Sequence, residues 1–422
     1  MPNDGAVDTV SGTGADAAWR ARAERAVAAT ASTGSKRPRA LYGPGAPDDA
    51  PLHYVRAEGC RLTTPSGRTL VDCTMALGAV ALGYADPDVT RAVQAAAAAG
   101  PVAGLTHAGE PALAERFVDV VPCAERVLFL KSGAEAVAAA VRLARAATGR
   151  DRVVGAGYFG WLDWCSRGPG VPAGASADFA PVPWGDAAAL GTAVDAGPPP
   201  AAIVLEPVVE CLPPAGYLAA ARALADRVGA ALVFDEVKTG GRLHAGGYQA
   251  VCGVTPDLAT FGKAIANGYP LAAVVGRAAV MDAARTAWIS STLASEATAL
   301  AAAHAVLDRH AREDVSGALA RTGARLTKAV GDALVGAGGG ALGVALHGIP
   351  PMFFLRFADR DGEPGEARES RFLTAAREAG VLFKRGAYNY AALAHDEAAV
   401  ARVAEAAAAG FAALTTHEAL LT

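Results

Sequence analysis

The sequence lacks the features of several large protein classes. Its 38 basic and 42 acidic side chains leave a formal net charge of −4, so we expect neither nucleic acid nor an anionic membrane as a partner. No apolar run reaches the roughly 18–20 residues of a membrane span. Residues 1–27 lack the basic start and apolar core of a secretory signal. We therefore expect a cytoplasmic protein.

The cysteines follow no pattern of metal binding or disulfide pairing. There is no CxxC pair, and no histidine lies at ligand spacing from a cysteine. We interpret these residues as small buried hydrophobes in a reducing compartment, and we expect no metal. The six positions are Cys60, Cys73, Cys123, Cys165, Cys211 and Cys252.

Length and composition predict a large domain accompanied by a smaller one. The chain has 422 residues, of which 52% are hydrophobic, far more than a marginal core requires. Residues 1–14 are mostly Gly, Ser, Thr, Asp and Ala, and we expect disorder there. Residues 15–85 are predicted to hold an N-terminal segment and part of the small domain, 86–320 the large domain, and 321–422 the rest of the small domain.

The most informative stretch, residues 230–276, combines an acid and a lysine. The apolar run 230–234 predicts a buried strand of a parallel sheet that ends at Asp235, and ligands of open α/β sheets bind at such strand ends. Lys263 follows 28 residues later on a glycine-flanked turn. Pyridoxal phosphate needs these two groups, because a lysine amine forms a Schiff base with its aldehyde and a carboxylate keeps its pyridine nitrogen protonated. The alternative is an N-cap aspartate and a surface lysine.

This stretch contains two strings, FDEVKTGGRL and GVTPDLATFGKAIANGYPLAAVVGR, which resemble the active-site region of class III aminotransferases. The resemblance covers roughly residues 40–415 and is greatest to the branch of glutamate-1-semialdehyde aminomutase and sugar- or natural-product-associated relatives. It implies a fold type I α/β enzyme, with a mostly parallel seven-stranded sheet sandwiched by helices and a smaller α/β domain from both termini. It also implies pyridoxal 5'-phosphate held on Lys263, Asp235 pairing with the ring nitrogen, and Val237 against one ring face.

A strand, turn and helix over residues 126–148 predict a phosphate site. The free N–H groups and positive end of the helix attract an anion, Ser132 supplies a hydroxyl, and Gly133 lets the backbone approach. An ordinary N-capped helix is the alternative. Many relatives carry Thr at Ala134 and Asn at Lys131, so one side-chain contact is missing or replaced here.

The resemblance assigns two further residues to the cofactor pocket. Tyr158, in the string GYFGWLDW, corresponds to the aromatic that stacks on the cofactor ring. Phe159 and Leu162 replace the two histidines usual in this loop. Either side chains behind the pocket are repacked, or the pocket is drier and has lost a proton-handling or substrate-binding group, which makes Phe159 a substrate candidate. Glu206 matches the family's EPV string near the cofactor O3′, the alternative being a glutamate satisfied by a helix end.

Three residues in the last third complete the candidate site. Thr292 precedes a long helix, and in class III enzymes this threonine reaches the cofactor phosphate of the other subunit, so we expect a homodimer. Glu296 is interpreted as a helix-capping acid. Arg385 and Asn389 lie in a turn that varies on the family's substrate side. Arg385 is a candidate for holding a substrate carboxylate, with a solvated Lys-Arg pair as the alternative.

These residues favour transfer of an amino group between a small amino donor and a carbonyl substrate, in specialised metabolism. In the implied mechanism the substrate amine displaces Lys263 from an internal aldimine, and the freed lysine becomes the proton-transfer base. An aminomutase, epimerase or racemase, decarboxylase or lyase on the same scaffold is the first alternative. A non-catalytic cofactor-binding module is the second. The sequence does not distinguish between substrates.

Overall fold

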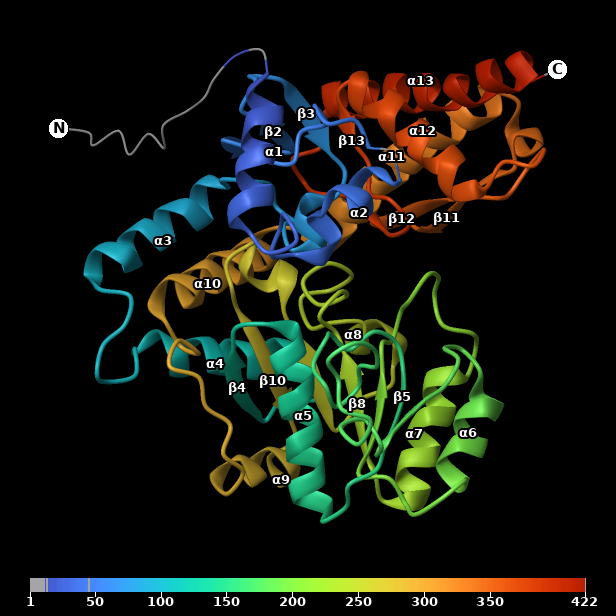
Figure 1. The fold of residues 1–422 in the computed structure, drawn as a ribbon. Coiled ribbons are helices and arrows are strands. Elements are labelled where there is room, and N and C mark those ends of the chain that lie inside the picture. Colours follow the sequence, from blue (N-terminus) through green and yellow to red (C-terminus); the bar gives the residue numbers. More distant parts are fainter. Residues whose placement is uncertain (1–11, 13, 45, 422) are drawn as a thin grey trace. The chain divides into compact units, whose positions relative to one another are not determined.

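The computed structural model describes residues 12, 14–44 and 46–421 and divides the chain into two compact units (Figure 1). The large unit is formed by Gly78–Ala81 and Pro87–Ala318, and the small unit by Met1–Leu77, Leu82–Asp86 and Leu319–Thr422. The predicted N-terminal tail lies outside the described residues, except for Gly12 and Gly14.

A mostly parallel sheet of seven strands forms the centre of the large unit, as predicted. The strands lie in the order β4-β10-β9-β8-β7-β5-β6. Within this sheet only β10 runs antiparallel to its neighbours, β4 and β9, while the other pairs are parallel. The strands are β4 (Arg126–Leu130), β5 (Val153–Ala156), β6 (Phe179–Pro181), β7 (Ala202–Leu205), β8 (Ala231–Asp235), β9 (Leu258–Phe261) and β10 (Ala272–Gly276).

Helices cover both faces of this sheet, which is why its central strands are continuous apolar runs. On one face, α5 packs its alanines and Leu143 against Val204, Val233 and Val274. On the other, Phe117 of α4 packs edge-on against Phe129 and Phe261. The large unit's helices are α3 (Pro87–Ala99), α4 (Gly109–Val120), α5 (Gly133–Thr148), α6 (Ala187–Asp195), α7 (Tyr217–Val228), α8 (Gln249–Cys252), α9 (Ala278–Met281) and α10 (Ala297–Arg312).

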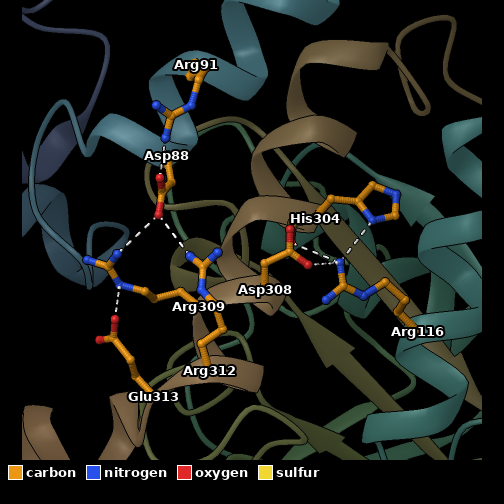
Figure 2. Close-up of polar contacts among 8 residues, drawn as sticks. All are labelled: Asp88, Arg91, Arg116, His304, Asp308, Arg309, Arg312 and Glu313. Atoms are coloured by element: carbon orange, nitrogen blue, oxygen red, sulfur yellow. Dashed lines mark hydrogen bonds and ion pairs between the residues drawn. The ribbon is translucent and has the colours of Figure 1, made fainter.

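Charged side chains link α3 and α4 to α10 at the surface of the large unit (Figure 2). The Asp88 carboxylate accepts hydrogen bonds from Arg309 at 3.2 Å and Arg312 at 2.9 Å. Arg116 of α4 pairs with Asp308 at 2.9 Å. Because the side chains around Asp88 are 27–74% exposed, each pair contributes about 0–1 kcal/mol. We call the ion pairs of Asp88 with its three arginines the Asp88 network.

The small unit contains two sheets. One has the order β1-β2-β3-β13, and its β2 and β3 pair antiparallel. The other has the order β11-β12-β14. The strands of the small unit are β1 (Arg56–Glu58), β2 (Arg61–Thr63), β3 (Thr69–Asp72), β11 (Val344–Ile349), β12 (Met352–Phe357), β13 (Val381–Leu382) and β14 (Asn389–Tyr390). Its helices are α1 (Ala15–Ala26), α2 (Pro38–Tyr42), α12 (Gly365–Glu378) and α13 (Glu397–Leu421), together with most of α11 (Val315–Gly336).

One helix is long and apolar enough to span a membrane by length and composition, although charged residues interrupt its apolar sequence. Within α13, the stretch Glu397–Thr415 has a mean hydropathy of 1.3 and passes that test by length and composition. The many alanines of this helix raise the mean. About two fifths of this stretch is buried, and Phe411 packs against Phe372 of α12 at 4.8 Å between ring centroids. A helix in the core of a folded unit passes the same test.

Candidate active site

Five of the candidate residues follow strands that end at the same edge of the large sheet. Because β4, β5, β7, β8 and β9 run in one direction, their carboxyl ends meet at one edge, where ligands of open α/β sheets bind. These residues are Ser132 after β4, Tyr158 after β5, Glu206 after β7, Asp235 at the end of β8 and Lys263 after β9.

Asp235 is a buried carboxylate held in a fixed orientation. Its Oδ1 accepts the Val237 N–H at 3.0 Å and the hydroxyl of Thr260, its partner on β9, at 3.1 Å. Burial, and next the nearby Glu206 carboxylate, raise the pKa of Asp235 to about 7. Within the described part of the chain both bonds reach Oδ1, so Oδ2 remains to accept a hydrogen bond from a protonated ring nitrogen.

Lys263 begins a short 3-10 turn, Lys263–Ala266, directly after Gly262. Its φ of +51° lies in the left-handed region that side chains other than glycine seldom adopt, as is common at functional sites. Burial lowers the pKa of the Lys263 amine, while the carboxylates of Asp235 and Glu206 oppose that shift. A lowered pKa increases the neutral fraction of the amine, which is the nucleophilic form.

Val237 lies between the two turns that carry Ser132 and Lys263. A Cβ atom added to Gly133 would come within 2.7 Å of Val237 Cγ1, and one added to Gly262 within 3.3 Å of the same atom. Glycine at both positions therefore lets the two turns close around one apolar side chain. Contact between Val237 and a cofactor ring remains a prediction.

The turn before α5 is an ordinary helix N-cap, and it also leaves backbone N–H groups that could bind a phosphate. Ser132 is the N-cap of α5 and forms a capping box with Glu135, which accepts the Ser132 N–H at 2.8 Å and its hydroxyl at 2.9 Å. The ordinary N-capped helix is thus present. The N–H groups of Gly133 and Ala134 still point out of the first helical turn, at the positive end of the helix dipole. A phosphate at this turn remains a prediction.

A buried ion pair stands next to Tyr158. The Tyr158 N–H donates to Glu206 Oε1 at 2.8 Å, and Lys238 Nζ lies 2.8 Å from Glu206 Oε2. The side chains of Lys238 and Glu206 are only 8% and 10% exposed, whereas Tyr158 is 71% exposed. Lys238 lies within the string FDEVKTGGRL, but the sequence analysis predicted no role for it. A lysine in a buried stretch that follows two acids was the available signal, since such a lysine needs a carboxylate partner.

A family model described as "Aminotransferase class-III" matches residues 44–160 and 193–387, which together cover more than half of the chain. The chain belongs to the class III aminotransferases. This family uses pyridoxal phosphate. The resemblance and the fold expected from the sequence are both confirmed.

Curated relatives in this class III family include two enzymes of different reaction type. Glutamate-1-semialdehyde 2,1-aminomutase of Symbiobacterium thermophilum is 40% identical over 253 residues, which span 55% of this chain and 58% of that protein. The 2'-deamino-2'-hydroxyneamine transaminase of Streptomyces kanamyceticus is 36% identical over 329 residues, covering 76% of this chain and 82% of the relative. Both kinds of relative had been expected from the sequence.

Solved structures of similar proteins align with almost the whole length of this chain. FumI of Sphingopyxis sp. MTA144, in its pyridoxal-phosphate internal aldimine form, has a TM-score of 0.88 and 27% identity over 96% of this chain and 97% of its own. An omega-transaminase from Sphaerobacter thermophilus has a TM-score of 0.82 and 25% identity, with 95% and 98% coverage. These likenesses confirm a fold type I enzyme.

The residues at the sheet edge fit the cofactor of a class III aminotransferase. Asp235 offers a buried oxygen for a protonated nitrogen, and Lys263 offers an amine with a lowered pKa. The Gly133 and Gly262 turns both close on Val237, which brings one apolar side chain next to the two turns. These observations concern different ends of the cofactor, so they test its fit independently.

Phe159 is packed inside the large unit. Its side chain is 4% exposed and lies against Phe179 and Trp164, with ring centroids 6.0 and 6.2 Å away. This packing favours repacking as the reason for the loss of the family's histidine at this position. Phe159 therefore has no open face to offer a substrate.

Thr292 is exposed near the start of α10. It lines a hollow of about 330 Å³ together with Glu296 and residues 99–103 and 105–108. Glu296 is the N-cap of α10, accepting the N–H groups of Thr298 and Ala299, and it also pairs with Lys131 at 3.1 Å. The Lys131 pair, which sequence reasoning missed, connects the strand before Ser132 to the helix after Thr292.

The two substrate candidates of the small unit already have partners. Arg385 pairs with Glu366 at 2.6 Å and with Glu369 at 3.7 Å, so it is not the solvated residue that one alternative described. Asn389 is 1% exposed and accepts the Lys384 N–H at 2.8 Å. A substrate carboxylate at Arg385 would have to compete with two glutamates.

Proposed function

We propose that this chain is a transaminase that moves an amino group between a small amino donor and a carbonyl substrate of specialised metabolism. The observation that carries the proposal is the placement of Asp235 and Lys263 at the ends of adjacent strands, with the carboxyl pKa raised and the amine pKa lowered. The similarity to the 2'-deamino-2'-hydroxyneamine transaminase supports the substrate class.

Each residue at the sheet edge then has a separate task. When bound, pyridoxal phosphate supplies an aldehyde and an electron-withdrawing ring. Asp235 Oδ2 accepts the hydrogen bond of the ring nitrogen and keeps that nitrogen protonated. Lys263 Nζ binds the cofactor covalently and, once free, moves the proton at the substrate carbon. Tyr158 and Val237 hold the two ring faces, and the first turn of α5 binds the phosphate.

We also propose a homodimer in which Thr292 reaches the cofactor phosphate of the neighbouring subunit. Leu105 lines the same hollow as Thr292 and is 87% exposed, and Leu293, next to Thr292 in the chain, is 51% exposed. These apolar side chains would be covered at a subunit interface. Light scattering of the purified protein gives the mass directly. A monomer that binds the cofactor with full affinity would contradict this assignment.

A cytoplasmic location is the corresponding proposal for the whole protein. All six cysteines are free in the structure, and three of them, Cys60, Cys73 and Cys123, are buried. Free thiols are typical of a reducing compartment. Fractionation of the native host, followed by detection of the protein, would test the location.

The decisive experiment incubates the cofactor-loaded protein with single amino donors in stoichiometric amounts. A transaminase converts the bound cofactor to its amino form and releases one equivalent of keto product for each site. Lys263→Ala should form no covalent adduct and serves as the control. An amino group moved within one molecule, without any keto product, would instead assign the aminomutase reaction of the other relative.

A further inference from the structure

Lys238 is a buried cation close to the candidate cofactor site, with no role in the proposed reaction. It follows Asp235 by three residues, and its ammonium group lies 2.8 Å from Glu206 on the neighbouring strand end. Burial of a charge is tolerated only when a partner compensates the lost hydration, so each of these two charged side chains depends on the other.

Glu206 in turn determines the shape of the loop that follows β5. Its Oε1 accepts the Tyr158 N–H at 2.8 Å. A Cβ atom added to Gly157 would come within 2.8 Å of Glu206 Cγ and 3.0 Å of its Oε1, so the loop closes onto the glutamate side chain. The Glu206 carbonyl is fixed as well, because it accepts the Trp184 indole N–H at 2.8 Å.

We propose that Lys238 is a positioning residue that acts through Glu206 to hold the loop presenting Tyr158 to the cofactor ring. The contacts form one continuous path from the Lys238 ammonium group through both carboxylate oxygens to the Tyr158 backbone. The inference rests on the proposed assignment of Tyr158 to the ring. It also gives Glu206 a role in holding this loop, in addition to its predicted place near the cofactor O3′.

The charges of this pair act on the reacting groups in opposite directions. Lys238 is among the groups that lower the pKa of Lys263, and Glu206 is among those that raise it. Because the two effects oppose each other, removing one member of the pair removes that opposition at the Lys263 amine. Comparing the single variants with the double variant therefore distinguishes an effect on the position of Tyr158 from an effect on the charge of the site.

The test compares Lys238→Met, Lys238→Arg, Glu206→Gln and the double variant Lys238→Met/Glu206→Gln. Lys328→Met is the matched control, because Lys328 makes an exposed pair with Asp332. The first measurement is the visible circular dichroism of the bound cofactor divided by its absorbance, which reports how firmly the ring is oriented. The second is the dissociation constant of the cofactor.

We expect Lys238→Met to halve the dichroism ratio and weaken cofactor binding about tenfold, a usual size for coupled neighbours. Tyr158→Ala should lower the same ratio, while Lys238→Arg and Lys328→Met should resemble the wild type. In the Glu206→Gln background, where the amide oxygen still accepts the Tyr158 N–H, Lys238→Met should add less than a twofold effect. This comparison remains valid even if Lys238→Met alone fails to fold, because the double variant leaves no unpaired charge.

Two results would overturn the inference alone. One is an unchanged dichroism ratio in Lys238→Met while Tyr158→Ala loses it. The other is a full, independent effect of Lys238→Met in the Glu206→Gln background. A wild-type protein that binds no cofactor would instead overturn the site assignment and this inference with it.

Discussion

The large unit holds two groups of charged residues that differ in their access to water. The Asp88 network joins α3 to α10 with arginines that are 27–74% exposed (Figure 2). The Lys238–Glu206 pair, beside Asp235 and Lys263, is 8–10% exposed. Both use carboxylates and cations within about 3 Å of each other, so their contact distances alone would suggest equal importance.

The difference in burial gives the two groups different tasks. Water screens the Asp88 network, so its pairs contribute little and depend on salt. At the sheet edge the loss of hydration shifts the pKa of Asp235 upward and that of Lys263 downward. Such shifts create reactive groups at the expense of stability. The following predictions test this contrast, from the largest expected effect to the smallest.

Lys263→Ala should lower turnover by about 10³-fold or more, because it removes both the covalent attachment and the proton-transfer base. Steady-state kinetics and the absorbance of the bound cofactor are the measurements. Lys328→Ala, at an exposed lysine, should leave both unchanged. Retained turnover in Lys263→Ala would assign the chemistry to a different lysine.

Lys238→Met should lower the free energy of unfolding of the cofactor-free protein by about 3–5 kcal/mol, because it leaves a buried carboxylate without its cation. Urea denaturation gives this value. The double variant with Glu206→Gln should recover most of the loss. If the single and double variants were equally unstable, the loss would come from packing rather than from charge.

Asp235→Asn should stabilise the cofactor-free protein above pH 7 while it abolishes most activity. The folded pKa of Asp235 is raised from 3.8 to about 7, so its favourable contribution is complete below pH 4 and is lost as the pH rises through 7. The three-unit shift corresponds to at most about 4 kcal/mol. Urea midpoints of both proteins at pH 4 and pH 8 test the sign. A gain of equal size at both pH values would refute the assigned cause.

Asp88→Asn should change the free energy of unfolding by about 1 kcal/mol or less and leave turnover unaffected. The change should shrink further between 0.05 and 0.5 M salt, since the network is exposed. Thermal unfolding at the two salt concentrations is the measurement. A loss comparable to that of Lys238→Met would show that the two groups are not different in kind.

Sequence patterns predicted the site residues that depend on local order along the chain. The apolar run before Asp235 and the glycine before Lys263 specify a strand end and a turn, and both are present. A parallel sheet then brings strand ends together without further information from the sequence.

The contacts that sequence reasoning missed join residues distant in the chain. Lys238 and Glu206 are 32 positions apart and meet only because β7 and β8 are neighbours in the sheet. The same holds for Lys131 and Glu296. The antiparallel direction of β10 was also unspecified, since an apolar run gives burial but not direction.

Strand β10 has a consequence for the spacing of the site. Its residue Ala272 pairs with Leu130 near the Ser132 turn, and its next residue, Ala273, pairs with Phe261 near the Lys263 turn. A single strand therefore fixes the separation between the phosphate end and the aldehyde end of the candidate cofactor site. A slip of one residue would displace one turn by about 3.3 Å and reverse the faces of β10. Cofactor binding is thus vulnerable to insertions or deletions in a strand that supplies none of the binding groups.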